Sequence, residues 1–223
     1  MKKISHFFAK PEGKFLGVVL ALIVVLFGYY FYAALSTPIR ASSGEDVVIT
    51  KTDHVRGAQD GKVTLVEFGD FQCPACGAYE PIVRQVLADN KANLKVSFRH
   101  FPLTQIHRNA LLAAKASEAA SLQGKFWEMH DILYDKQEEW SGAINARSFF
   151  VTYANTLGLN TDTFSKDLDS KAVEDKILAE YKEGVKLGVQ GTPTFFLNGK
   201  KIEDTPRGLA SFNKMIQDAI QAK

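Results

Sequence analysis

Apolar and polar residues follow two different periods along this chain, and these periods predict its strands and helices. Residues 63–68 form a near-continuous apolar run with β-branched side chains between Gly61 and Gly69, which predicts a buried strand. Residues 94–99 alternate apolar and polar side chains and predict a half-buried strand. Between them, apolar residues recur at helical spacing after Pro74. Together these elements predict a βαβ unit with parallel strands and a right-handed crossover.

A block of helices is predicted next, because no strand pattern occurs between residues 103 and 188. Helical periodicity recurs there, and a glycine follows each of the last two helices. The predicted helices cover residues 109–122, 126–134, 145–157 and 171–187. Strands return at residues 194–197 and 200–202 around Asn198-Gly199, a strong hairpin signal. A final helix carries one apolar stripe, formed by Leu209, Phe212, Met215, Ile216 and Ile220.

The N-terminal part of the chain predicts a membrane anchor. Residues 1–14 carry four lysines and one glutamate, whereas residues 15–35 carry no charge and are long enough to span a bilayer, which takes about 20 apolar residues. Because the lysines precede the span, residues 1–14 are expected in the cytoplasm and the chain after Ser36 outside it. A cleaved signal peptide is the alternative, with Ala34-Leu35-Ser36 as its cleavage site, but the apolar stretch exceeds the usual length of about 7 to 15 residues. We therefore expect an uncleaved transmembrane signal-anchor helix over residues 15–35.

One folded domain is expected after the anchor. Residues 36–45 are polar and predict a linker to a domain over residues 46–223. Within residues 46–51, Val47-Val48-Ile49 predicts an additional edge strand. A hydrophobic content of 46% and a net charge of +2 are typical of a globular domain, and no basic stripe indicates a nucleic-acid partner.

Both cysteines of the chain lie in one motif, Cys73-Pro74-Ala75-Cys76, directly after the first strong strand pattern. Cys73 is therefore expected at the N-terminus of the following helix. Unpaired N–H groups and the helix dipole stabilise a thiolate there, so we expect the pKa of Cys73 to lie below its ordinary value of about 8.5. Cys76 is expected on the same helix face but deeper. We therefore assign Cys73 as the sulfur that exchanges with substrates and Cys76 as the resolving sulfur.

Two other uses of this motif are less well supported. A zinc site needs four ligands, and the five histidines show no ligand spacing, so no metal is expected. A structural disulfide with a two-residue spacer would close too short a loop to constrain the unfolded chain strongly. A Cys-x-x-Cys motif beside a βα unit is typical of a redox site. A location outside the cytoplasm also suits such a site, because disulfides persist there.

Two positions outside the motif are further candidates for the redox site. Glu67 lies inside an apolar strand, where burial would raise the pKa of its carboxyl group and let it accept the proton of Cys76. The alternative is a glutamate turned to solvent at a strand edge. Thr192-Pro193 precedes a predicted strand and indicates a tight turn; the residues alone leave open a cis peptide bond or a trans proline that begins the strand.

The remaining candidates are interpreted as structural. His100 and His107 could flank the active face, but single histidines without a ligand partner are usually packed or capping residues. The aromatic residues of the helical block are expected in its core rather than in a substrate groove. These residues are Phe126, Trp127, Phe149, Phe150 and Tyr153.

The order of elements and three motifs resemble the DsbA-like thiol:disulfide oxidoreductases, in particular membrane-anchored and Gram-positive-type members. The resemblance covers about residue 47 to the C-terminus. The motifs are the two-cysteine motif, Gly191-Thr192-Pro193-Thr194, and the stretch from Phe98-Arg99-His100-Phe101-Pro102-Leu103 to Gln123-Gly124-Lys125-Phe126-Trp127. The resemblance implies an α/β thioredoxin fold with an all-helical subdomain inserted at about residues 103–190. It also implies a cis peptide bond between Thr192 and Pro193 near the sulfurs, and a proton-transfer role for Glu67.

The resemblance further implies a dithiol oxidase that introduces disulfides into exported proteins. A substrate thiol would attack the Cys73–Cys76 disulfide, and the substrate's second thiol would release the enzyme dithiol. No cofactor is expected beyond this redox-active disulfide. The implied partners are unfolded or partly folded exported proteins with free thiols, and a DsbB-like or other membrane quinone-linked reoxidant. The catalytic domain is expected in the periplasm or at the cell exterior.

The direction of exchange stays open at this point, because oxidases, reductases and isomerases share such a site. Ala75 stands where the best-known family members carry histidine, which removes one possible stabiliser of the Cys73 thiolate. Thr192 before the proline is more frequent in isomerases and in Gram-positive-type oxidases. A non-enzymatic alternative is a membrane-tethered protein-binding or chaperone-like module whose disulfide is structural.

Overall fold

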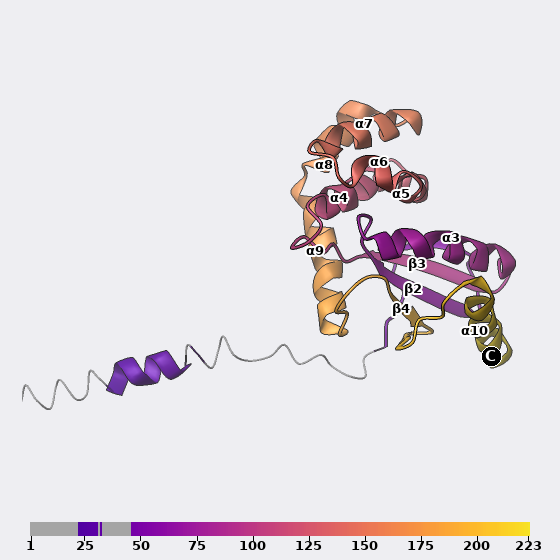
Figure 1. The fold of residues 1–223 in the computed structure, drawn as a ribbon, viewed down its shortest axis with the longest axis horizontal. Helices are drawn as coiled ribbons and strands as arrows, with labels where there is room; N and C mark the ends of the chain where they lie inside the picture. The colour runs from indigo at the N-terminus through magenta and orange to yellow at the C-terminus, as the bar shows by residue number, and fades with distance from the viewer. Residues whose placement is uncertain (1–21, 31, 33–45) are drawn as a thin grey trace, which may run out of the picture. The chain divides into compact units, whose positions relative to one another are not determined.

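The computed structural model describes residues 22–30, 32 and 46–223 of the chain (Figure 1). It contains two compact units, Met1–Arg40 and Ala41–Lys223. Residues 22–30 and 32 are helical, and among the described residues no helix is both long and apolar enough to cross a membrane. The predicted cytoplasmic segment 1–14, the linker 36–45 and the rest of the predicted span 15–35 lie outside the described residues.

The second unit is built on a mixed five-stranded sheet with the order β1-β3-β2-β4-β5. The central strand β2 pairs in parallel with β3 and antiparallel with β4, and both edge strands pair antiparallel. The parallel pairing of β2 and β3 across a helix confirms the predicted βαβ unit. The strands are β1 (His54–Gly57), β2 (Val63–Gly69), β3 (Leu94–His100), β4 (Thr194–Leu197) and β5 (Lys200–Lys201).

Alternate residues of β2 pack on opposite faces of the sheet, as the period of a strand requires. Val63 and Leu65 pack with α3 (Pro74–Asp89) and α10 (Leu209–Gln221). Val66 and Phe68 pack on the other face, with residues of α9 (Lys171–Lys186). Because Glu67 shares the parity of Val63 and Leu65, its side chain lies on the α3 face of the sheet.

The inserted helices lie on the same side of the sheet as α3, and α9 runs from them past the sheet (Figure 1). Their core contains buried alanines of α4 together with large aromatic side chains. Phe126, Phe150 and Tyr153 are buried there, and Trp127 and Phe149 pack against them, which confirms the predicted core. The inserted helices that precede α9 are α4 (Ala110–Ser121), α5 (Phe126–Asp135), α6 (Gln137–Trp140), α7 (Ala146–Thr156) and α8 (Thr161–Leu168).

The predicted edge strand at residues 46–51 is wrong. The backbone N–H of Val47 donates a hydrogen bond of 2.9 Å to Gly199, but the carbonyl oxygen of Val48 is taken by Nη2 of Arg99 at 2.7 Å. A turn follows, in which Asp53 accepts a hydrogen bond of 2.9 Å from the Thr50 hydroxyl. The Arg99 side chain thus binds the Val48 carbonyl oxygen, which a neighbouring strand would need as an acceptor. The first strand of the sheet forms later in the chain, at β1.

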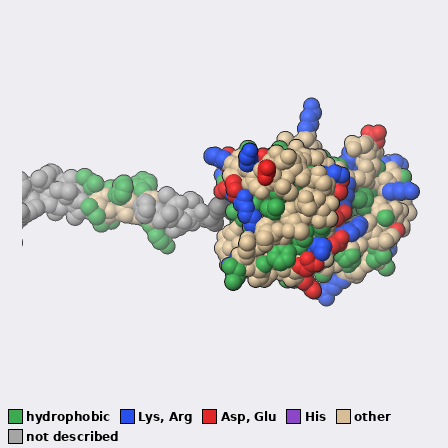
Figure 2. Space-filling view, turned by 90° about the horizontal axis from the view of Figure 1, so that it is seen from above, with side chains coloured by type: hydrophobic (Ala, Val, Ile, Leu, Met, Phe, Trp, Pro, Cys, Tyr) green, Lys and Arg blue, Asp and Glu red, His purple; other side chains and the backbone are tan. Residues whose placement is uncertain are grey.

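The hairpin between β4 and β5 forms as predicted. Asn198 and Gly199 have φ values of +49° and +87°, the left-handed conformations that a two-residue hairpin turn requires. Asn198 also accepts a hydrogen bond of 3.0 Å from the Thr64 N–H, which fixes the turn against β2. On the face drawn in Figure 2, basic and acidic side chains are interspersed over this unit.

Candidate active site

The loop after β2 places Cys73 at the N-terminus of α3. Cys73 is the N-cap residue, with extended φ and ψ of −69° and 121°, and Pro74 is the first helical residue. Proline suits this position because its missing N–H would have no helical partner. The Cys73 carbonyl oxygen accepts the first helical hydrogen bond, 3.1 Å from the Gly77 nitrogen. The predicted position of Cys73 is confirmed.

The Cys73 sulfur lies in a site that stabilises its thiolate. The residue is only 7% exposed, and its pKa is lowered to about 5. A hydrogen bond with the Cys76 thiol is the largest cause. A hydrogen bond with Thr192 and, to a smaller extent, the backbone N–H groups of Cys76 and Ala75 act in the same direction against the effect of burial. These N–H groups belong to the first turn of α3, where no carbonyl group of the helix can accept from them. The predicted helix-end effect on Cys73 is therefore present.

Cys76 has the opposite environment. It is fully buried, and burial raises the pKa of its thiol well above the ordinary value; the hydrogen bond with Cys73 and the nearby Glu67 act in the same direction. Both cysteines are free thiols in the structure. The motif therefore combines one readily ionised sulfur and one sulfur that keeps its proton.

Glu67 is buried near both sulfurs and is not a solvent-facing glutamate. Its exposed fraction is 3%, and burial raises the pKa of its carboxyl group well above the ordinary value. Glu80 and Cys73 raise the pKa further, whereas Arg56 opposes them. A neutral carboxyl group beside a buried thiol can give or take a proton.

The loop before β4 lies against the Cys73 sulfur. The peptide bond between Thr192 and Pro193 is cis, which confirms the geometry that the resemblance implied. The Cys73 thiol donates a hydrogen bond of 3.3 Å to the Thr192 carbonyl oxygen. The Thr194 hydroxyl donates to the Gly191 carbonyl oxygen at 2.7 Å and holds the loop in place. The structure thus brings Thr192 and Pro193 together with the Cys73–Cys76 motif.

The two candidate histidines are structural, as interpreted from the sequence. His100 is buried, with Nε2 2.9 Å from Oε1 of Glu118. His107 places Nδ1 2.7 Å from Oδ2 of Asp70, and the same oxygen accepts a hydrogen bond of 2.9 Å from the Leu103 N–H. Asp70 thereby fixes the start of the insert beside the redox loop.

Sequence reasoning missed the side chains that hold the redox loop against the insert. Asp70 follows β2 directly, and its position next to the motif was a usable signal. The side-chain amides of Gln72 and Gln137 gave no signal, because their hydrogen bonds, including the one that Gln72 accepts from the Asn109 backbone N–H, join segments that are distant in the sequence. The phenol of Tyr134 was also missed; it is buried near Cys76, and its ring lies 5.0 Å from that of Phe71.

Among the described residues, two clusters of carboxylates and a histidine have the spacing of metal ligands, but basic side chains neutralise both. Glu80, His130 and Asp131 form one cluster, in which Arg56 lies 2.9 Å from both carboxylates. His100, Glu118 and Glu180 form the other, in which Lys176 Nζ lies 2.7 Å and 2.6 Å from the two carboxylates.

A Cys-x-x-Cys motif at a helix N-terminus, a cis proline against its sulfur and a helical insert over the site define a DsbA-like thiol:disulfide oxidoreductase. The chain belongs to the thioredoxin family, whose family model, described as Thioredoxin, matches residues 49–218. The non-enzymatic alternative is therefore set aside.

Solved structures agree with this class. The oxidised BdbD of Bacillus subtilis is 25% identical, covers 80% of this chain and 97% of its own, and superimposes with a TM-score of 0.69. A thioredoxin-like oxidoreductase from Silicibacter pomeroyi DSS-3 is 26% identical, covers 78% of this chain and 92% of its own, and has a TM-score of 0.62. The alpha-DsbA1 of Wolbachia pipientis, at 20% identity, 79% and 94% coverage and a TM-score of 0.69, shares the fold.

Curated relatives are longer proteins. The Na(+)/H(+) antiporter NhaA 1 of Salinispora arenicola is 46% identical over 150 residues, which are 67% of this chain and 22% of the antiporter. The NhaA 3 antiporter of Salinispora tropica is 43% identical over 149 residues, with the same coverage. This chain thus spans less than a quarter of the length of these relatives.

Proposed function

We propose that this protein is an extracytoplasmic dithiol oxidase that introduces disulfides into exported proteins through Cys73 and Cys76. One observation carries the proposal: the pKa of Cys73 is held at about 5 by hydrogen bonds with the Cys76 thiol, with Thr192 and with N–H groups of the helix start. A thiolate that is stable at neutral pH favours the reduced form of the protein. A protein that favours its reduced form transfers its disulfide readily to substrate thiols.

The size of this effect follows from the lowered pKa. At pH 7 a thiol with an ordinary pKa, between about 8.5 and 9.0, is almost fully protonated, whereas Cys73 is almost fully ionised. Because pH 7 lies two units above the pKa of Cys73, ionisation of this thiol stabilises the reduced protein by about 2.7 kcal/mol. This free energy corresponds to about 60 mV for a two-electron couple. Because the pKa is depressed, this stabilisation is largest above pH 9 and disappears as the pH falls through about 5.

The reaction starts with attack by a substrate thiolate on the Cys73 sulfur of the oxidised protein. The bond between Cys73 and Cys76 breaks, a mixed disulfide forms at Cys73, and the electron pair passes to the Cys76 sulfur. The substrate's second thiolate then attacks the substrate sulfur of the mixed disulfide. The substrate disulfide forms, Cys73 leaves as a thiolate, and two electrons have passed from substrate to protein.

Glu67 is proposed to handle the proton of Cys76. The high pKa of Cys76 means that this sulfur takes up a proton when it leaves, and the neutral carboxyl group of Glu67 can supply it. In the reverse direction, Glu67 accepts the proton when Cys76 attacks. In the mixed disulfide Cys73 carries no charge, so its contribution to the raised pKa of Glu67 disappears and the carboxyl group ionises more readily.

The proposed location and partners follow from the sequence and the chemistry. The uncharged stretch at residues 15–35 and the preceding lysines support an anchor with the catalytic domain outside the cytoplasm. Unfolded exported proteins with free thiols are the proposed substrates, and a DsbB-like or other membrane quinone-linked protein is the proposed reoxidant. The transport activity of the antiporters is not carried over, because this chain matches only 22% of their length.

A disulfide reductase or isomerase is the second candidate function, and Ala75 favours it. In an oxidase with histidine at this position, that side chain can stabilise the thiolate further, whereas Ala75 cannot. Equilibration of the protein with glutathione buffers measures the reduction potential. We expect a value less negative than about −180 mV, on the side of the disulfide oxidases. A value of about −180 mV, as in protein disulfide isomerase, or near −270 mV, as in thioredoxin, would favour the second candidate.

A further inference from the structure

Gln137 is one of the side chains through which the helical insert contacts the redox loop. This residue begins α6, and its Nε2 donates hydrogen bonds to two backbone carbonyl oxygens of the loop. The distances are 2.6 Å to Phe71 and 2.9 Å to Cys73. Both N–H bonds of the amide are therefore used on the segment that carries the exchanging cysteine.

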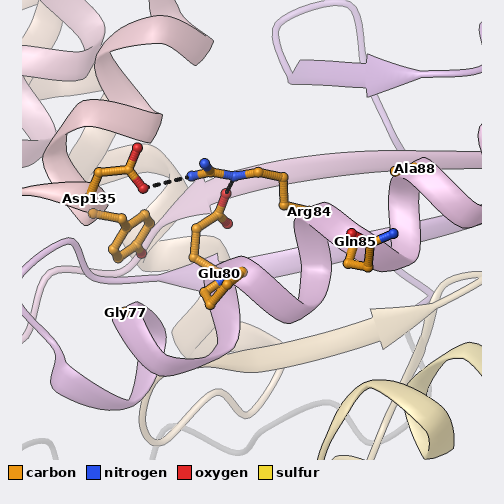
Figure 3. A pocket seen from close by; sticks show the side chains of 8 residues that line it. Gly77, Glu80, Arg84, Gln85, Ala88 and Asp135 are labelled. Carbon is orange, nitrogen blue, oxygen red and sulfur yellow. Dashed lines mark hydrogen bonds and ion pairs between the residues drawn. The ribbon is translucent and has the colours of Figure 1, made fainter.

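Gly77 provides the space for this amide. A Cβ atom at Gly77 would lie 2.6 Å from Oε1 and 3.1 Å from Cδ of Gln137, closer than van der Waals contact allows. Gly77 lies in the first turns of α3, where the helical backbone does not itself require glycine. The close approach of the Gln137 amide therefore accounts for glycine at this position. Figure 3 shows Gly77 on α3 and Asp135 of the insert at the same pocket.

Gln72 also links the loop to the insert, but its hydrogen bonds do not involve the carbonyl groups of the loop. Gln72 donates to the Ser141 carbonyl oxygen at 2.7 Å and accepts from the Asn109 N–H at 2.7 Å. These hydrogen bonds fix the side chain of Gln72 itself. Gln137 instead fixes the loop backbone at Phe71 and Cys73, on both sides of Gln72. The Cys73 carbonyl oxygen accepts hydrogen bonds from the Gly77 N–H and from the Gln137 amide. The Gln137 amide therefore stabilises the first turn of α3.

We propose that Gln137 is a positioning residue through which the helical insert sets the ionisation of Cys73. The N–H groups of Ala75 and Cys76 stabilise the thiolate only while the backbone of this turn points them at the sulfur. Gln137 fixes that backbone, and its N–H groups also offset the negative ends of two carbonyl dipoles near the thiolate. The inference rests on the proposed function, in which Cys73 is the exchanging sulfur.

Titration of the reduced full-length protein by thiolate absorbance at 240 nm tests the proposal in the Gln137→Met variant. Methionine keeps the length of the side chain but has no donor. We expect the pKa of Cys73 to rise by about one unit, a tenfold loss of thiolate at a pH below both values, with a matching shift of the reduction potential. The matched control is Gln123→Met, because Gln123 donates one hydrogen bond to the Asn160 backbone and accepts one from it, within the insert, and makes none to the loop. That variant should leave the pKa unchanged.

A second variant keeps the test decisive if Gln137→Met folds poorly. Gly77→Ala displaces the amide by steric contact and should raise the pKa in the same direction, with no additional rise in a Gln137→Met background. An unchanged pKa in both single variants, beside a wild-type value of about 5, would overturn the role of Gln137 alone. A wild-type value near 9 would instead overturn the proposed function and this inference with it.

Discussion

Cys73→Ser should reduce the rate of disulfide transfer to a reduced model peptide to that of the uncatalysed exchange, a loss of about a thousandfold or more. The serine oxygen cannot form the mixed disulfide, so neither step of the exchange can begin. Stopped-flow measurement of peptide oxidation gives the rate. Retention of activity in this variant would contradict the assignment of the exchanging sulfur.

Cys76→Ala is the matched variant and should behave differently. Removal of Cys76 also removes the hydrogen bond that contributes most to the low pKa of Cys73, but the N–H groups of the helix start remain. The variant therefore keeps enough thiolate to attack disulfides and form mixed disulfides, and it has no second thiol to release them. Exported proteins should therefore accumulate as adducts on non-reducing gels. The Cys73→Ser/Cys76→Ala double variant should show none, and adducts in that variant would mean that their formation does not involve Cys73.

Glu67→Gln should slow the exchange by about 100-fold and at the same time stabilise the reduced protein at neutral pH. Glutamine keeps the shape of the side chain but cannot transfer the proton of Cys76. The stability effect follows from the raised pKa of the buried carboxyl group. At a pH below the ordinary carboxyl pKa of 4.5, Glu67 is protonated in both the folded and the unfolded state, so its burial causes no loss of stability from ionisation. As the pH rises above 4.5, the unfolded state ionises first and wild-type stability falls by about 1.4 kcal/mol per pH unit, up to the folded pKa.

Urea unfolding at pH 5 and pH 8 measures this effect, and Glu118→Gln provides the control. Glu118 is equally buried, but its pKa is lowered despite burial by hydrogen bonds with His100 and His54. Its ionised form therefore stabilises the fold at neutral pH, and that contribution is lost only under acidic conditions. Glu118→Gln should destabilise the protein at pH 8 and leave the intrinsic exchange rate unchanged. Equal pH dependence in wild type and Glu67→Gln would contradict a buried, neutral Glu67.

The sequence predicted the parts of the fold that depend on local pattern. The parallel pair β2 and β3 followed from one apolar run and one alternating stretch. The β4–β5 hairpin followed from Asn198-Gly199, and the position of Cys73 at the helix start followed from Pro74 after it. The short helices α6 and α8 were not predicted. α6 spans a single turn, and α8 follows the cap of Asn160, whose side chain accepts from the Thr163 N–H. Neither segment is long enough to show a clear helical period.

The parts that could not be predicted depend on contacts between distant segments. The edge strand was misplaced because the Arg99 side chain binds the Val48 carbonyl oxygen, a contact across the chain that no periodicity reports. The same holds for the redox site. Cys73, Cys76 and Glu67 are recognisable by type and spacing, whereas Gln137 is a polar residue in a helical region until the fold brings it to the carbonyl groups of Phe71 and Cys73.

The proposed function depends on the ionisation of Cys73, which the pH dependence of its alkylation by iodoacetamide in the reduced protein measures. Only the thiolate reacts, so the rate reports its fraction at each pH. The structure predicts a single midpoint at about pH 5, absent in Cys73→Ser. A midpoint near 9, as for an ordinary thiol, would contradict it.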